Sequence, residues 1–446
     1  MTAHPSPTPT PSDEPSSTPS NNHPSPTPTP SDEPGSTPSN HPSPTRVLVL
    51  NSGSSSVKYQ LLDMRDDGRL AQGLVERIGE ATSRLVHTPL QGGGAKREKT
   101  GPIADHAAAL KAVAEELATD GLGLDSPELA AIGHRVVHGG LRFTEPTVID
   151  DEVLAEIERL VPVAPLHNPA NLTGIRTATA LRPDLPQVAV FDTAFHTTMP
   201  ESAARYAIDV ETADAHRIRR YGFHGTSHAY VSREAARLLG KEPEEVNVIV
   251  LHLGNGASAS AVRGGRCVDT SMGLTPLEGL VMGTRSGDVD PAVTFHLKRV
   301  AGMSTDEIDV LLNKKSGLVG LCGDNDMREI RRRIDEGDQR AALAFEIYVH
   351  RLKKYIGAYY AVLGRVDAVV FTAGVGENAA PVREAAIAGL EELGLAVDAE
   401  LNSVRSDEAR IVSPVYARVA VAVVPTDEEL EIARQSYALV HEEVNA

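Results

Sequence analysis

The chain contains one local arrangement twice: an apolar strand, a turn of small polar residues, and a second strand. The first copy, "VLVLNSGSSSVKYQLLDM", covers residues 47–64, and the second, "NVIVLHLGNGASAS", covers residues 247–260. Runs of β-branched residues and Leu that are bounded by Gly, Asn and Ser are typical of paired strands joined by a turn. Because a chain of 446 residues is long enough for two domains, this repetition predicts two related halves.

Strand-like and helix-like segments alternate through the rest of residues 46–446. This alternation predicts an α/β fold with sheets flanked by helices, in which ligands bind beyond the carboxyl ends of the strands, in a cleft between the halves. Local signals include an N-cap at Asp105 and a tight hairpin at Gly264-Gly265. Further strands are expected at 130–137, 187–191, 366–371 and 418–424, and helices at 105–118, 151–160 and 227–240.

Residues 1–45 differ from the rest in composition. The segment "HPSPTPTPSDEPSSTPSN" at 4–21 recurs at 23–40 with one change, and a truncated third copy follows. Such a Pro-rich segment with almost no apolar side chains cannot bury enough surface to offset its ordering entropy, so we expect it to be disordered. A solvated tail is the favoured interpretation. A docking arm for a proline-reading module is the alternative, and its partner is unknown.

Composition argues against several classes of protein. The tail carries four acidic residues and no basic one, so the formal net charge of -18 leaves -14 for residues 46–446. No basic stripe typical of a nucleic-acid binder is visible. No apolar run approaches the roughly 20 residues of a membrane helix, and the chain begins without the features of a secretory signal. We therefore expect a cytoplasmic protein with no nucleic-acid or membrane partner, and two reduced thiols at Cys267 and Cys322.

The two polar turns are the first functional signal. Gly, Ser and Asn let backbone N–H groups and hydroxyls approach an anion. One such turn is usually only a turn, but two at equivalent places can hold a phosphate chain from both sides. A third segment, "FTAGVGEN" at 371–378, predicts a Gly-rich loop between a strand and a helix, where a nucleotide commonly binds.

Charged residues at the ends of apolar runs are the second signal. Arg135, Asp192, Arg285 and Glu428 each follow such a run or lie in a Gly-bearing loop. Each alone is most simply a salt bridge or a cap. Together they predict an anion site, because arginine offers a planar fork to carboxylate or phosphate, and carboxylates suit Mg²⁺.

Several of the 16 histidines lie beside these loops. His224 and His228 have i,i+4 spacing near an expected helix start, but the Glu of the H-E-x-x-H zinc motif is absent. Zinc is therefore the weaker interpretation. A histidine that donates to a transferring phosphoryl group is the favoured functional one, and ordinary loop histidines remain the simplest alternative.

Together these motifs resemble the acetate kinase family, within the wider group of sugar kinases and actin-like ATPases. The resemblance covers essentially all of residues 46–446. It implies two actin-like (ribonuclease H-like) domains, 46–193 completed by a C-terminal helix at 429–446, and a nucleotide-binding domain at 194–428. The matching stretches include "GHRVVHGG", "VFDTAFHTTMP", "RYGFHGTSHAYV", "TPLEGLVMGTRSGDVDP" and "PTDEELEIA".

The resemblance implies a homodimer that reversibly transfers the ATP γ-phosphoryl group to acetate, in line, with Mg²⁺ or Mn²⁺. It implies catalytic roles for Asp192, His224, Arg285 and Arg135, acetate binding by Arg135, Val137, Leu166 and Pro276, and metal binding by Asn51 and Glu428. His167 would support the site. ATP and its phosphates would contact Lys58, Ser54, Ser56, His252, Leu253, Gly254, Asn255, Gly256, Gly374, Val375, Gly376, Glu377 and Asn378.

Acetate is already ionised at neutral pH, so Asp192 is expected to orient groups rather than act as a base. The segment "LCGDNDMREI" at 321–330 departs from the family pattern, and we expect it to be peripheral to the catalytic set. A kinase for propionate or butyrate, and one that uses pyrophosphate, are close alternatives. A non-catalytic ATP-binding scaffold is the alternative from a different class.

Overall fold

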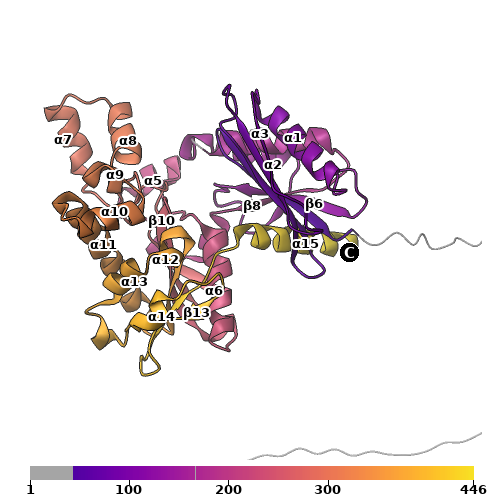
Figure 1. The fold of residues 1–446 in the computed structure, drawn as a ribbon. Helices are drawn as coiled ribbons and strands as arrows, with labels where there is room; N and C mark the ends of the chain where they lie inside the picture. Colours follow the sequence, from indigo (N-terminus) through magenta and orange to yellow (C-terminus); the bar gives the residue numbers. More distant parts are fainter. Residues whose placement is uncertain (1–43, 166, 446) are drawn as a thin grey trace, which may run out of the picture. The chain divides into compact units, whose positions relative to one another are not determined.

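The computed structural model describes residues 44–165 and 167–445, which belong to one compact unit. Nearly all of the predicted disordered tail, and Leu166, lie outside the described residues. The unit contains two mixed β-sheets, each with helices on both faces (Figure 1). The predicted α/β class is confirmed.

The first sheet has eight strands in the order β5-β4-β3-β2-β1-β6-β8-β7. Its central strands β1, β6 and β8 are parallel to one another, and every other neighbouring pair is antiparallel. The strands are β1 (Arg46–Ser52), β2 (Ser56–Asp63), β3 (Gly68–Glu76), β4 (Arg84–Pro89), β5 (Arg97–Thr100), β6 (Leu129–Val136), β7 (Thr147–Val148) and β8 (Gln187–Phe191).

Alternate residues of β1 pack on opposite faces of this sheet. Leu48 and Leu50 pack with the helices on one face, and Val47 and Val49 pack with the C-terminal helix α15 on the other. This is the period-two pattern expected of a central strand that is buried on both faces. The helices are α1 (His106–Thr119), α2 (Asp151–Arg159), α3 (Asn168–Leu181) and α15 (Glu428–Asn445).

The second sheet repeats this topology with six strands in the order β11-β10-β9-β12-β14-β13. Its strands β9, β12 and β14 are parallel to one another, and an antiparallel strand again closes the edge. The shared pattern confirms that the two halves are related. The strands are β9 (Asn247–Leu253), β10 (Ala257–Arg263), β11 (Arg266–Thr270), β12 (Ala368–Thr372), β13 (Arg410–Ile411) and β14 (Ala420–Val423).

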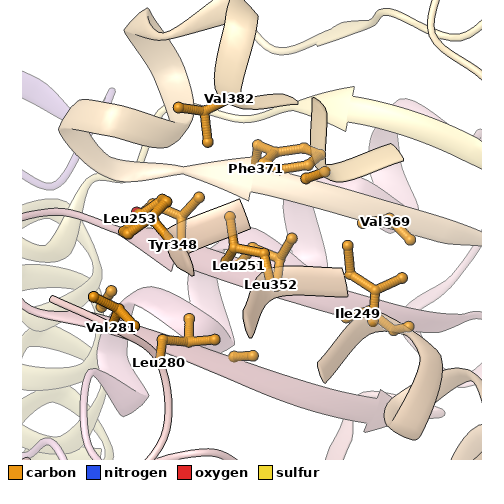
Figure 2. Packing of buried hydrophobic residues seen from close by; sticks show 14 of the residues in the cluster. Ile249, Leu251, Leu253, Leu280, Val281, Tyr348, Leu352, Val369, Phe371 and Val382 are labelled. Atoms are coloured by element: carbon orange, nitrogen blue, oxygen red, sulfur yellow. The ribbon is translucent and has the colours of Figure 1, made fainter. Parts of the chain in front are cut away.

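A large apolar cluster lies between the second sheet and the helix α11 (Figure 2). Ile249, Leu251 and Phe371 from the sheet meet Tyr348 and Leu352 of α11 there. The opposite face of the sheet packs on α6. The helices of this part are α4 (Glu201–Ala204), α5 (Val210–His216), α6 (Gly225–Leu238), α7 (Ala292–Val300), α8 (Thr305–Lys314), α9 (Gly317–Cys322), α10 (Met327–Asp335), α11 (Gln339–Leu363), α12 (Ala373–Asn378), α13 (Ala380–Ile387) and α14 (Ala399–Ser403).

Several local predictions are confirmed. Asp105 caps α1 by accepting a hydrogen bond from the Ala108 N–H at 2.8 Å. Gly264 and Gly265 have φ of 54° and 75°, as a tight hairpin turn requires. Cys267 and Cys322 are free and buried. Within the described ranges, no helix is both long and apolar enough to cross a bilayer.

Two local predictions are wrong. No loop separates strand and helix in 371–378, since α12 starts directly after β12. A single residue, Ala373, makes the turn from β12 into α12. Its φ is 63°, and its N–H donates to the Glu377 carboxylate at 2.8 Å. The second error is the start of α6, which begins at Gly225 rather than at residue 227.

Candidate active site

The ends of the three parallel strands in the first sheet carry a polar cluster. Alternation along β1, β6 and β8 places Asn51, Arg135 and Asp192 on the face that packs against α15, because Val49, Ala131 and Val190 of the same strands pack there. Helix α15 begins at this edge with Glu428. Four residues that are far apart in sequence therefore meet at the carboxyl end of one sheet.

Arg135 is the centre of this cluster. Its Nη2 lies 2.5 Å and its Nε 3.2 Å from the two Asp192 carboxylate oxygens, and Nε also lies 3.4 Å from Glu428 Oε2. Burial raises the pKa of Asp192, and the nearby Glu428 raises it further, although Arg135 opposes both effects. Among the described residues, Arg135 Nη1 has no hydrogen-bond partner, so one edge of the guanidinium remains available to a ligand.

Lys58 lies on β2 directly opposite Asn51 in the sheet register, and it contacts α15. Its Nζ lies 2.6 Å from Glu429 Oε1. Ser54 and Ser56 lie at the connection between β1 and β2, where the Gly53 N–H donates to the Ser56 carbonyl at 2.8 Å. Ser54 is exposed. The structure thus brings Lys58 to the cluster, whereas no hydrogen bond among the described residues ties the two hydroxyls to it.

The second sheet has an equivalent edge, but with uncharged groups. His252, Thr372 and Thr426 lie at or just beyond the ends of its parallel strands, on the α6 side. The Ser227 hydroxyl of α6 bonds both His252 Nδ1 and Thr426 Oγ1 at 2.8 Å. Burial is the main cause that lowers the pKa of His252, so this histidine is neutral at pH 7.

The two edges join where β8 meets the start of α6. The Gly225 N–H donates to the Asp192 carbonyl at 2.9 Å. A Cβ on Gly225 would lie 2.2 Å from the same carbonyl oxygen, so only glycine permits this approach. His224, the residue before it, has φ of 57° and turns its ring toward the second sheet.

His224 and Arg285 both approach Gly256. A Cβ built on Gly256 would lie 3.4 Å from His224 Nε2 and 3.5 Å from Arg285 Nη1. Among the described residues, Arg285 has no carboxylate within salt-bridge distance; its Nη1 donates to the Pro276 carbonyl at 3.0 Å. Burial lowers its pKa. A half-buried arginine without a nearby carboxylate creates a local preference for an anion.

Two further histidines face this positive region. Burial is the main cause that lowers the pKa of His167 to about 4, and the charges of Arg135 and Arg285 lower it further. The pKa of His224 is also far below its ordinary value, through burial first and then the neighbouring histidines and arginines. Both rings are therefore neutral at pH 7 and can donate a hydrogen bond without adding charge.

The turn that joins β9 and β10 consists of Gly254, Asn255 and Gly256, and it closes through a Gly254 N–H bond to the Gly256 carbonyl at 3.0 Å. Leu253, the last residue of β9, is buried in the core behind this turn. Asn325 Nδ2 donates to Asn255 Oδ1 at 2.8 Å. The segment 321–330, expected to be peripheral to the catalytic set, thus contacts one of the two candidate phosphate turns.

The candidate nucleotide segment lies in α12. Glu377 accepts hydrogen bonds from the Ala373 and Thr426 N–H groups at 2.8 and 3.1 Å, which ties α12 to the chain entering α15. Arg383 is fully buried and donates to the Gly376 and Glu377 carbonyls at 2.9 Å. The other residues predicted here, Gly374, Val375 and Asn378, lie on the same short helix.

The residues predicted to bind acetate are only partly brought together. Val137 is buried with Phe223 in the core of the second half, and Pro276 lies against Arg285 through its carbonyl. Leu166 lies outside the described residues. The sequence reasoning missed Asn171, whose side chain bonds the Ser52 carbonyl and the Val137 N–H at 3.0 and 3.1 Å, because an isolated helical Asn gives no local signal.

His224 and His228 are joined by Ser258 rather than arranged as free ligands. Within the part of the chain that is described, no group of three or more His, Cys, Asp or Glu side chains is arranged to hold a metal ion.

Comparison with known proteins decides the family. The sequence profile of the Acetokinase family matches residues 46–434. The chain belongs to this family. It is 86% identical over 398 residues to acetate kinase of Streptomyces avermitilis, covering 89% of this chain and 98% of the relative. Acetate kinase of Streptomyces griseus is 87% identical over 398 residues, covering 89% of this chain and 97% of the relative.

Solved structures of the acetokinase family show the same fold. Acetate kinase of Porphyromonas gingivalis has a TM-score of 0.84 at 45% identity, over 89% of this chain and all of that one. A propionate kinase of Francisella tularensis has a TM-score of 0.82 at 44% identity, covering 88% of this chain and 98% of that one. The predicted actin-like fold is confirmed by these likenesses, and the tail lies outside the family match.

Proposed function

We propose that this protein is an acetate kinase, which reversibly transfers the γ-phosphoryl group of ATP to acetate to form acetyl phosphate and ADP. The proposal is carried by the 86% identity to a curated acetate kinase over nearly the full length of that relative. The geometry supports it, since Arg285 has no carboxylate counter-charge among the described residues and lies beside neutral His224 over a Gly turn.

Arg135 and Arg285 bind the two anions that react. The free Nη1 edge of Arg135 takes the acetate carboxylate, while Asp192 holds the opposite edge of the same guanidinium. Acetate is already a carboxylate at neutral pH, so its oxygen attacks without loss of a proton and no general base is needed. Asp192 therefore acts by orienting Arg135, which brings acetate in line with the phosphoryl group.

Charge stabilisation supplies the rest of the catalysis. In phosphoryl transfer, negative charge spreads over the equatorial oxygens of the moving group, and fixed donors lower the barrier. Arg285 supplies a full charge, and neutral His224 supplies an N–H beside it. Because both are held before substrate binds, little reorganisation is required in the transition state.

Mg²⁺ fits the residues at the edge of the first sheet. Glu428 has a single contact among the described residues, the 3.4 Å approach to Arg135, so one carboxylate oxygen is left for a metal. Asn51 contributes an amide oxygen on the same face. Two hard oxygen ligands, completed by water and phosphate oxygens, suit Mg²⁺, and Mn²⁺ accepts the same set. The ion would neutralise charge on the ATP phosphates.

The second half is the proposed nucleotide side. The turn Gly254–Gly256 offers backbone N–H groups to the phosphates, next to the Leu253 and His252 strand end. The short helix α12 and its Gly residues cover the adenosine, and Lys58, Ser54 and Ser56 close the phosphate side from the first half. We also propose the domain division at 46–193 with 429–446, and 194–428.

A propionate or butyrate kinase is the second candidate, favoured by the 0.82 TM-score to a propionate kinase. One methylene in an apolar pocket changes selectivity by only about 1–3 kcal/mol, so activity on several short acids is expected. Val137 and Pro276 are the described members of the proposed methyl pocket, and their bulk favours acetate; Leu166 lies outside the described residues.

We further propose a homodimer in the cytoplasm. Helix α7 has no buried residue and leaves Phe295 and Val300 at 58% and 71% exposed. The exposed apolar side chains of this helix suit contact with a second copy, and Phe295→Asp should shift the mass measured by light scattering to that of a monomer. Two free cysteines suit a reducing compartment.

The test is a trapping assay. Purified protein is incubated with Mg-ATP, hydroxylamine and acetate, propionate or butyrate, and the hydroxamate is measured, with a pyrophosphate arm as alternative donor. Acetyl hydroxamate formed fastest with acetate and ATP would support the proposal. If no acid gave hydroxamate with either donor, the kinase proposal would be abandoned in favour of an ATP-binding scaffold.

A further inference from the structure

The hydroxyl of Ser258 joins two histidine rings in the second half. Ser258 Oγ lies 2.9 Å from His224 Nδ1 and 2.7 Å from His228 Nε2. Ser258 and His228 are both fully buried. Alternation along β10 directs Ser258 toward α6, since its neighbours Ala257 and Ala259 pack in the core on the other face.

Counting hydrogens selects one arrangement of this trio. A serine hydroxyl has one proton, so it can donate to only one of the two rings and must accept from the other. If both rings donated to it, the serine proton would need a third partner, and Ser258 Oγ has none among the described residues. Therefore only one of the two neutral rings, His224 or His228, carries its proton on the nitrogen that faces Ser258.

The free nitrogen of His228 decides which ring donates. His228 Nδ1 is buried and has no hydrogen-bond partner among the described residues. If His228 accepted from Ser258, its proton would sit on Nδ1 as a buried donor without an acceptor. Orphaned buried N–H groups are rarer than unsatisfied acceptors. His228 Nε2–H therefore donates to Ser258, and the Ser258 hydroxyl donates to His224 Nδ1.

We propose that Ser258 and His228 are positioning residues that hold His224 in the tautomer with its proton on Nε2. This inference rests on the proposed function only for its effect on rate. A Cβ built on Gly256 would lie 3.4 Å from His224 Nε2 and 3.5 Å from Arg285 Nη1, so the imidazole and the guanidinium lie next to the same turn.

The tautomer of His224 with its proton on Nε2 needs a stabilising hydrogen bond at Nδ1, on the other side of the ring. Without a bound anion, the positive Arg285 favours the opposite tautomer, in which a lone pair on His224 Nε2 faces the guanidinium. The Ser258 hydroxyl opposes that change by occupying His224 Nδ1 as a donor. The site is then ready to bind a phosphoryl group without a proton rearrangement, which is the form of preorganisation that lowers a barrier.

The direct test uses no substrate. Protein labelled with ¹⁵N in its histidines is studied by NMR at pH 7.5, and the His224 signals are assigned by their loss in His224→Gln. We expect a protonated Nε2 and an unprotonated Nδ1 for this residue. A proton on Nδ1 in the wild-type protein would overturn the proposal, whatever the enzyme activity.

Variants supply the second test. Ser258→Ala should let His224 populate both tautomers and should lower kcat roughly ten- to a hundredfold, the scale seen for outer-shell partners, with little change in the KM for ATP. Ser260→Ala is the matched control, because Ser260 is also buried on β10 and bonds Thr270 instead. It should leave the His224 signals and kcat unchanged.

His228 offers a conservative pair that does not alter Ser258. His228→Gln keeps an N–H donor near the Nε2 position and should retain the His224 tautomer, whereas His228→Leu should lose it. Unchanged His224 signals in a folded His228→Leu or Ser258→Ala protein would contradict the inference. If the hydroxamate assay failed while the wild-type Nε2–H tautomer was found, the proposed function alone would be lost.

Discussion

The two sheets share one topology but present opposite chemistry at the same edge. In the first, the ends of β1, β6 and β8 face the start of α15 and carry Asn51, Arg135 and Asp192. Arg135 forms ion pairs there with Asp192 and Glu428. In the second, β9, β12 and β14 face the start of α6 and carry His252, Thr372 and Thr426. His252 and Thr426 are joined there by neutral hydrogen bonds through the Ser227 hydroxyl.

Under the proposed function, this difference divides one reaction between the two copies of a repeated backbone. A carboxylate substrate and a metal ion need full charges, which are present at the first edge. A phosphate chain needs many donors but few charges, because charges would hold the product too tightly. The second edge has hydroxyls, backbone N–H groups and neutral histidines. Arg285 is the exception, a cation on the neutral side that has no carboxylate partner among the described residues.

The largest expected effect on the reaction comes from removing the Arg285 side chain. Arg285→Ala should lower kcat by about 10³-fold or more, by analogy with arginine fingers, while ATP binding changes little. Steady-state kinetics with varied ATP and acetate would measure both. Arg340→Ala, at an exposed arginine, is the control and should behave as wild type. A near-normal kcat in Arg285→Ala would exclude the assigned role.

The next largest effect is expected on stability, at Gly225, where the two sheet edges join. Gly225→Ala places a methyl group 2.2 Å from the Asp192 carbonyl oxygen, so we expect a loss of about 3 kcal/mol in the free energy of unfolding, measured by denaturant titration. Gly357→Ala in α11 is the matched control. Its Cβ would meet nothing within 4 Å, so it should stabilise the protein by about 0.5–1 kcal/mol.

Buried histidines should make stability depend on pH. Burial lowers the pKa of His134 to about 4, although its bond to Gln187 opposes the shift. Below about pH 6.5, His134 is therefore protonated in the unfolded chain but stays neutral in the folded protein. The stabilisation is complete above pH 6.5 and is lost as pH falls toward 4.

For His134 alone, this loss amounts to about 2 kcal/mol between pH 7 and pH 5. His134→Leu should reduce the pH dependence of the unfolding free energy by that amount. Ile132→Val, at a buried neighbour on β6 that carries no titratable group, is the comparison and should keep the wild-type slope. Equal slopes in wild type and His134→Leu would show that His134 is not held neutral.

The smallest effect is expected for the exposed ion pair. Lys58 is 56% exposed and pairs with Glu429 at 2.6 Å, so Lys58→Met should change the unfolding free energy by less than about 1 kcal/mol. The effect should shrink further at 1 M salt, because exposed charges are screened. A loss of several kcal/mol would mean that the first edge depends on Lys58 as strongly as on Arg135.

Much of the fold could be predicted because its signals are local. The apolar alternation of β1 and β9, the Asp105 cap and the Gly264-Gly265 turn each depend on a few neighbouring residues. That α12 follows β12 without a loop could not be foreseen. The direct connection depends on the left-handed conformation of Ala373 and on the hydrogen bond between Glu377 and the distant Thr426. The contact between Asn325 and Asn255 could not be foreseen either, since the two residues are 70 positions apart.

The sequence by itself determined the two α/β halves, the polar turns and the identity of the charged residues, because periodicity and turn chemistry act over a few residues. Only the tertiary structure decided which nitrogen of Arg135 is free, that Arg285 has no carboxylate partner among the described residues, and that Ser258 lies between His224 and His228. These facts depend on the register of strands and on the approach of helices, since hydrogen bonds and charges act over a few ångströms in space, whatever the separation along the chain.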